Sequence, residues 1–141
     1  MIIKQLSIFL ENKSGRLTEI TEILEKESIN ISAFSVADTS DYGILRLIVS
    51  NPDKALKILK ENSVAVNLTE VIGIVVPHEP GGLAKALRIL SDENVSVEYM
   101  YAFAMKNKAT VIIRTDNINN TIEILQKHKL ELLRKSDIYE V

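Results

Sequence analysis

Two short turns in this sequence carry residue types that could hold a small ligand. Each follows an apolar stretch and opens an amphipathic one. A glycine at the start of a helix lets a ligand approach the main chain, and the first N–H groups and the helix dipole favour an anion such as a carboxylate. Gly15 and Gly81 could instead serve only to make tight turns. The first turn is Asn12, Lys13, Ser14, Gly15, Arg16 and Leu17, and the second is His78, Glu79, Pro80, Gly81, Gly82 and Leu83.

The residues available for catalysis are few. A hydrolase or transferase needs a nucleophile and a base, usually with a histidine or paired carboxylates in a cleft. The chain has two histidines, His78 and His128, and no cysteine. His128 lies near the polar end of an expected helix, where a solvated side chain is the usual state. Two histidines could hold a metal only with help from carboxylates, and Gly81-Gly82 lacks the following Lys-Ser or Lys-Thr of a P-loop. The sequence therefore predicts a protein that is not an enzyme, with no metal and no cofactor.

The two turns belong to a repeat that runs along the whole chain. Leu17 and Leu83 are 66 positions apart, and so are Gly15 and Gly81. Other matching residues keep the same offset, which predicts two copies of one unit, at residues 1–69 and 70–141. A lone domain of about this size buries little surface, so we expect the copies to support each other.

Each copy reads as strand, helix, strand, strand, helix, strand. Alternating or continuous apolar runs indicate the strands, and apolar residues at helical spacing indicate the helices. Asn51 is a good helix cap, and Pro52 is tolerated in a first helical turn. This order predicts an α+β fold of two ferredoxin-like βαββαβ units, each an antiparallel sheet with both helices on one face. The expected strands are 2–10, 29–38, 44–49, 64–68, 71–76, 95–105, 108–115 and 130–139, and the expected helices open at Ser14-Gly15 and end near Glu27, open at Asn51, and span 83–92 and 118–128.

Composition excludes several other classes of protein. The chain is 46% hydrophobic and 26% charged, with a net charge of −2 and basic residues dispersed among acidic ones. A nucleic-acid surface would need a concentrated basic face, and a membrane span would need roughly 18 unbroken apolar residues. We find neither, and no signal peptide, so no nucleic-acid or membrane partner is expected. The absence of cysteine fits a cytoplasmic protein.

The two units resemble the ACT domain, the amino-acid-sensing regulatory module. The resemblance rests on the first turn with Ile29-Asn30-Ile31 opening the second strand, and it extends to a second copy through Pro80-Gly81-Gly82-Leu83 and Val95-Ser96-Val97. In the serine-sensing ACT domain of phosphoglycerate dehydrogenase, one Asn of the first turn and one Asn before the second strand of the partner domain hold the ligand. Asn12 and Asn30 match these positions, whereas the second copy has His78 and Ser96. Ser14 departs from the family's usual Pro, which Pro80 retains, and the identity of the amino acid stays open.

The resemblance implies a non-catalytic protein that binds a small amino acid and controls a partner protein, an enzyme not identified by the sequence. It adds Asn30, Ile31, Ser96 and Val97 to the turn residues as ligand-binding positions. Separately, we expect the chain to form a homodimer through a helix face or a sheet face. A structural or adaptor subunit with vestigial ligand sites is the alternative. An acylphosphatase-like hydrolase would need an Arg-lined phosphate loop, and Arg16 is a single residue.

The edges of the two sheets suggest how the copies join. Tyr99, Tyr101 and Phe103 share one face of an expected edge strand, where they serve either pairing or the core. We expect strands 31–38 and 97–104 to meet side by side in one eight-stranded sheet. Each site would then combine one turn with the strand entry of the other copy: the first turn with Ser96, and the second with Asn30. If like units pair between two chains instead, Asn12 and Asn30 share a site.

Overall fold

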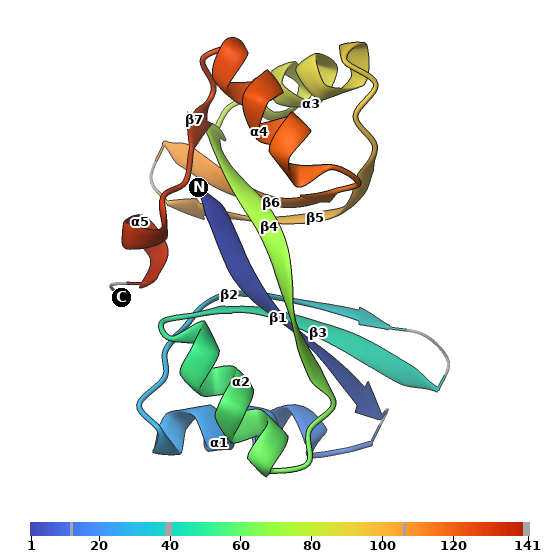
Figure 1. Ribbon diagram of the computed structural model, residues 1–141, viewed down its shortest axis with the longest axis vertical. Helices are drawn as coiled ribbons and strands as arrows, with labels where there is room; N and C mark the ends of the chain where they lie inside the picture. Colours follow the sequence, from blue (N-terminus) through green and yellow to red (C-terminus); the bar gives the residue numbers. More distant parts are fainter. Residues whose placement is uncertain (12, 39–40, 106, 140–141) are drawn as a thin grey trace. The chain divides into compact units, whose positions relative to one another are not determined.

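The computed structural model describes residues 1–11, 13–38, 41–105 and 107–139 (Figure 1). Its elements repeat the βαββαβ order twice, which confirms the predicted α+β, ferredoxin-like class. In chain order they are β1 (Ile2–Glu11), α1 (Arg16–Lys26), β2 (Ile31–Asp38), β3 (Tyr42–Val49), α2 (Pro52–Glu61), β4 (Val66–Pro77), α3 (Gly82–Asp92), β5 (Val97–Met105), β6 (Lys108–Thr115), α4 (Ile118–Lys127), β7 (Glu131–Leu132) and α5 (Lys135–Tyr139).

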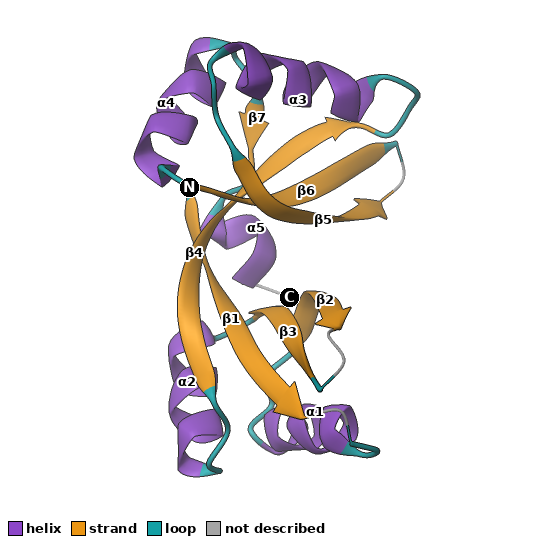
Figure 2. Cartoon of the chain, turned by 90° about the vertical axis from the view of Figure 1, so that its right-hand side faces the viewer, coloured by secondary structure: helices purple, strands orange, loops and turns teal. Residues whose placement is uncertain are grey.

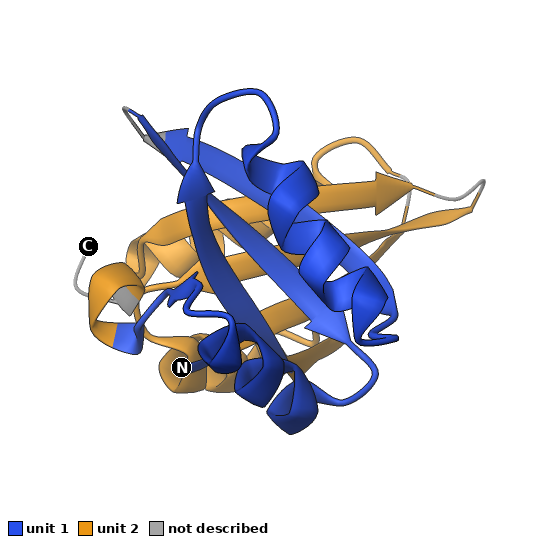
Figure 3. Cartoon of the chain, turned by 90° about the horizontal axis from the view of Figure 1, so that it is seen from above, with its two compact units in different colours: residues 1–3, 70–135 blue, residues 4–69, 136–141 orange. Residues whose placement is uncertain are grey.

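The chain forms two compact units that do not follow the repeat to its ends (Figure 3). Unit 1 comprises Met1–Ile3 and Glu70–Lys135, and unit 2 comprises Lys4–Thr69 and Ser136–Val141. The first residues of β1 therefore belong with the second repeat, and the end of the chain belongs with the first. The domain boundaries 1–69 and 70–141 stay a prediction.

Unit 2 is a four-stranded sheet with two helices on one face. Its strands follow the order β2-β3-β1-β4, and β1 and β3 are antiparallel with Leu6 opposite Leu47. Helices α1 and α2 lie on the same side of these strands (Figure 2). Alternation sends one side of β1 and β3 towards the helices, and the apolar stripe of each helix meets it. The resulting core contains Leu6, Ile8, Leu10, Ile20, Leu24, Ile29, Leu45, Leu47, Val49, Ala55, Leu59 and Val66.

Unit 1 repeats this arrangement with α3 and α4. Its strand order is β7-β4-β6-β5, with Ile72 opposite Ile113 between β4 and β6. The helix cap expected at Asn51 is confirmed, because Asn51 Oδ1 accepts from Lys54 N at 3.2 Å in unit 2. Asn117, at the matching position of the second repeat, caps α4 in the same way, and its Oδ1 accepts from Asn120 N at 3.1 Å. The core of unit 1 contains Ile72, Ile74, Val76, Ala86, Leu90, Val111, Ile113 and Leu125.

Three of the expected strands are wrong in extent. Residues 64–68 and 71–76 do not form separate strands, because β4 runs without a break from Val66 to Pro77. Residues 69 and 70, between the two expected strands, are Thr and Glu, and neither is a glycine or proline that would interrupt a strand. The expected strand 130–139 is strand only at β7, and α5 follows. Residues 134–137 are all polar and exposed, so no alternating apolar face exists there to bury against a sheet.

The expected joining of strands 31–38 and 97–104 is wrong. In the described part of the chain the strand order is β2-β3-β1-β4-β6-β5, with β7 beside β4, so β2 and β5 end this order and each pairs only with its hairpin neighbour. Among the residues that the structure describes, the sheet has seven strands rather than the expected eight. The continuous strands β1 and β4, each shared by both units, make the connection that the edges were expected to make. Tyr99, Tyr101 and Phe103 are half-buried in β5.

Gly73 gives a test of the β4 to β7 contact. A Cβ added there would lie 2.6 Å from Leu133 Cβ, a distance that forces Leu133 to move. We expect Gly73→Ala to lower the free energy of unfolding by about 1–3 kcal/mol, as overpacking does. Urea denaturation measures the loss. Asn67→Ala, at an exposed position of the same strand, is the control and should stay within about 0.5 kcal/mol of the wild type. Equal stability of the two variants would contradict the close contact.

Candidate functional site

The first turn starts α1 with an unusual backbone. Gly15 is the residue before the helix and has φ of 88° in the left-handed region, which favours glycine. No side chain caps the helix start, and Gly15 O accepts the first helical hydrogen bond from Glu19 N at 2.9 Å. Nothing lies within 4 Å of the position where a Cβ of Gly15 would stand. The main chain at the start of α1 is therefore open to approach.

The second turn has the same geometry. Gly81 has φ of 89°, precedes α3 without a side-chain cap, and accepts from Lys85 N at 3.0 Å. The space around its absent Cβ is also open. The neighbouring Gly82 is different, because a Cβ there would stand 2.2 Å from Pro77 O. The first repeat has Arg16 at the matching position, so the second turn is folded more tightly than the first.

Charge distinguishes the two turns. At the first, a carboxylate oxygen of Glu11 lies 2.9 Å from Lys13 Nζ and 3.8 Å from an Arg16 guanidinium nitrogen, and Arg16 also donates to Glu19 at 3.1 Å. The hydrogen bond and charge of Lys13, with the charge of Arg16, hold the pKa of Glu11 below its ordinary value of 4.5. This ion pair is complete at neutral pH and is lost as the pH falls through that lowered pKa.

The second turn is organised by backbone contacts and prolines. His78 N donates to Asn107 O at 2.8 Å, and Gly82 N donates to Glu79 O at 3.1 Å. Within the described part of the chain, no ion pair involves His78 or Glu79. A ligand at the first turn would therefore meet a cluster of paired charges, and a ligand at the second would not.

Each turn borders a hollow of the size that small ligands occupy, roughly 300–1,000 Å³. The hollow at the first turn measures about 460 Å³ and the one at the second about 320 Å³. The first is lined by Leu10, Glu11, Lys13, Ser14, Gly15, Arg16, Leu17, Thr18, Val36 and Gly43. The second is lined by Val75, Val76, Pro77, Glu79, Pro80, Gly81, Gly82, Lys85, Ala86 and Leu130.

The structure gathers most of the predicted turn residues around these hollows. His78 and Leu83 do not line the second one, and Asn12 lies outside the described residues. Sequence reasoning missed Val36 and Gly43, which reach the first hollow from β2 and β3, and Leu130, which reaches the second from the connection between α4 and β7. Their positions depend on strand pairing and helix packing, and no motif spacing reveals that.

The strand-entry residues are not beside the turns of their own units. Asn30 is exposed, and its N–H donates to Ser50 Oγ at 3.0 Å. It follows the end of α1, whereas the turn precedes the start, and 11 helical residues span roughly 16 Å. Ile31 lines a separate apolar hollow, Ser96 is exposed and Val97 is half-buried. A turn and a strand entry of the same unit therefore do not form one site, and the ligand-binding residues stay a prediction.

The described residues contain neither a metal-binding cluster nor a membrane-spanning helix. Among them, no group of three or more His, Cys, Asp or Glu side chains is placed to hold a metal ion. None of their helices is long and apolar enough to cross a membrane.

A family model described as an ACT domain pair matches residues 1–141. The chain belongs to the ACT domain pair family. No curated protein matches it. It is 58% identical to protein BT0572 from Bacteroides thetaiotaomicron, whose crystal structure superposes with a TM-score of 0.96 over 100% of this chain and 98% of that one.

More distant structures share the fold of this ACT domain pair. The ligand-free regulatory subunit of aspartate kinase from Thermus thermophilus is 10% identical, with a TM-score of 0.65 over 90% of this chain and 94% of that one. A putative C-terminal regulatory domain of aspartate kinase from Porphyromonas gingivalis is 13% identical, with a TM-score of 0.54 over 90% and 93% of the two chains. At these identities the likeness shows the fold alone.

The substitution Gly82→Ala tests the tight geometry of the second turn, because free space and a close contact predict opposite changes in the free energy of unfolding. Alanine is a better helix former than glycine by about 1 kcal/mol, so Gly82→Ala would stabilise the protein if space were free. The approach of Pro77 O instead predicts a loss of about 1–3 kcal/mol in the free energy of unfolding. Arg16→Ala, at the matching position of the first repeat, should change stability by less than about 0.5 kcal/mol. Thermal or urea unfolding of the two variants measures the difference, and a stabilised Gly82→Ala would contradict the geometry.

Proposed function

We propose that this ACT domain pair is a non-catalytic regulatory protein that binds a small amino acid at its strand–helix turns and controls a partner enzyme. The observation that carries the proposal is the repeated turn geometry. Two segments with different sequences, around Gly15 and Gly81, adopt the same left-handed residue before a helix that no side chain caps. Family membership supports an amino-acid ligand, and the aspartate kinase regulatory subunit and domain among the structural neighbours support a regulatory role.

The two ends of an amino acid would use different groups. The α-carboxylate would accept hydrogen bonds from the N–H groups at the start of α1 or α3, where the helix dipole also favours a negative charge. The ammonium group needs acceptors, which backbone carbonyls or the amide oxygen of Asn12 or Asn30 could supply. The remaining members of the proposed site are the turn residues together with Ile31, Ser96 and Val97.

The alternative is an adaptor subunit with vestigial sites. Regulation by a ligand requires two states that differ in their affinity for it, and an adaptor needs no such difference. The chemistry of the two turns favours the ligand-binding protein. We propose a cytoplasmic location, and the regulated enzyme stays unidentified.

We propose that the protein forms a homodimer in which like units pair between chains. β2 ends the strand order of unit 2, and residues 31–37 contain no charged side chain to protect that edge. Phe34 is 67% exposed on it, and Leu17 and Val36 are exposed beside it over an apolar hollow of about 250 Å³. This pairing would bring the first turn of one chain together with Asn30 of a second copy.

Binding should be visible as stabilisation by one of the twenty amino acids. A ligand at a hundredfold excess over its Kd raises the free energy of unfolding by about 2.7 kcal/mol. Thr18→Glu places a negative charge in the first turn of α1, where it suits the helix dipole but repels a bound carboxylate. We expect Thr18→Glu to weaken binding at least tenfold by calorimetry without loss of stability, while the neutral control Thr18→Gln keeps the affinity.

The second turn has a matched pair, Ala84→Glu and Ala84→Gln, at the corresponding position of α3. The pair shows whether the second turn also binds. If none of the twenty amino acids stabilises the wild type, the ligand-binding function is wrong and the adaptor is favoured.

The dimer has its own test, which is independent of ligand. We expect the wild type to sediment with the mass of two chains. Phe34→Lys puts a charge on the uncharged edge, and we expect it to sediment as one chain with an unchanged circular dichroism spectrum. Phe9→Lys is the matched control, because Phe9 is 51% exposed but lies on the opposite face of the sheet, next to Tyr42. Dissociation by Phe9→Lys alone would place the interface elsewhere.

A further inference from the structure

The end of the chain is fixed first on β4. β7 pairs with that strand, Leu132 opposite Ile74 and Glu131 opposite Val75. Leu133 N then donates to Gly73 O at 2.8 Å, and the Leu133 side chain is buried at 7% exposure. These contacts lie within unit 1, a few residues before β4 ends at Pro77 and the second turn begins.

The chain is fixed again a few residues later, within unit 2. Ile138 of α5 is 3% exposed, and its carbonyl accepts from Ser32 Oγ at 3.1 Å. Ser32 is the extra residue of an irregularity in β2, because Ile31 lies opposite Val49 while Ala33 lies opposite Ile48. The last segment of the second repeat thus holds the bulge that opens the second strand of the first.

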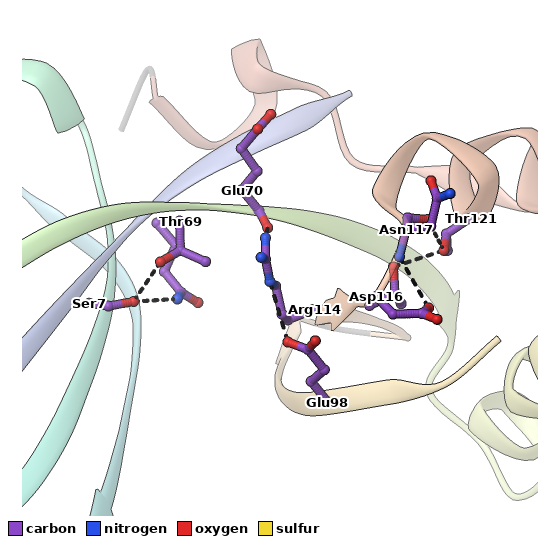
Figure 4. Close-up of polar contacts among 10 residues, drawn as sticks. Ser7, Thr69, Glu70, Glu98, Arg114, Asp116, Asn117 and Thr121 are labelled. Carbon is purple, nitrogen blue, oxygen red and sulfur yellow. Dashed lines mark hydrogen bonds and ion pairs between the residues drawn. The ribbon is translucent and has the colours of Figure 1, made fainter.

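The corresponding bulge in the second repeat is held differently. It lies between Val97 and Tyr99, so its extra residue is Glu98. The Glu98 carboxylate lies 3.5 Å from Arg114 Nε, and Arg114 Nη1 donates to Glu70 O at 2.7 Å (Figure 4). All three residues belong to unit 1. The first repeat therefore differs from the second, because α5 anchors its bulge through Ser32.

We propose that residues 131–138 form a strap that couples β4, beside the second turn, to the entry of β2, beside Asn30. Only residues 134–137 lie between the anchors at Leu133 and Ile138, and part of them is helical, so the segment has little slack to absorb a shift. A helix as short as α5 is not stable alone, so its conformation depends on both anchors. Release of either anchor therefore weakens the other.

The strap links the second turn energetically to the strand entry of unit 2. A change in β4 at Gly73 reaches Leu133, then α5, and then the bulge at Ser32. This coupling stands without any ligand, so its test and the test of amino-acid binding can fail independently. Where both hold, occupancy of the second turn would alter the strand entry of unit 2.

Backbone hydrogen exchange on the full chain tests the strap at both ends. Ile138→Ser removes the apolar anchor of α5, and we expect the Leu133 amide in unit 1 to exchange about 5- to 10-fold faster. Leu133→Ala removes the other anchor, and we expect the Asn30 and Ser50 amides, which are bonded to each other's residues at 3.0 and 2.9 Å, to exchange faster by a similar factor.

Ser136→Ala is the control, because Ser136 is exposed within the same segment and should leave both sets of amides within twofold of the wild type. If Leu133→Ala or Ile138→Ser fails to fold, Leu133→Val and Ser32→Ala make the same comparison more gently. Faster exchange only within the unit that carries the substitution, in either pair, would overturn the coupling.

Discussion

The uninterrupted run of β4 is the constraint on which the structure depends. Its twelve residues from Val66 to Pro77 serve unit 2 at one end and unit 1 at the other. Val71 and Ile72 are successive residues that point to opposite faces, and both are fully buried. β4 is therefore covered on both faces at this point, as in a central strand. β1 crosses the boundary in the opposite sense, since Ile3 belongs to unit 1 and Leu6 to unit 2. Two shared strands replace the linker that a pair of separate domains would need.

The repeat explains why so much of the fold could be predicted from the sequence. Apolar periodicity located every helix of the two βαββαβ copies, and Asn51 and Asn117 mark helix starts with caps that the structure contains. These are local signals, decided by residues within a turn or two of one another. The short α5 was missed because a single buried residue, Ile138, leaves no periodic pattern.

The errors concern pairings between distant segments. Strands 31–38 and 97–104 both look like edges in the sequence, and nothing in either one shows that β1 and β4 already join the repeats. The same limit applies to the candidate site. Gly15 and Gly81 were found because a left-handed residue before a helix favours glycine, whereas Val36 and Leu130 line the hollows through packing that the sequence does not encode locally.

Each end of the chain belongs to the compact unit of the other repeat, and this arrangement bears on how a protein of this kind could respond to a ligand. A ligand shifts an equilibrium only as far as its affinities for the two states differ, so regulation needs a part of the protein that can rearrange at modest cost. The cores of both units are densely buried and poorly suited to that. Of the described residues 131–138, only Leu133 in one unit and Ile138 in the other are buried, and local opening is easiest where buried contacts are few. The strap at residues 131–138 is therefore a part of the chain whose rearrangement costs little, and a signal from the second turn to the entry of β2 has a physical carrier without any change in either core.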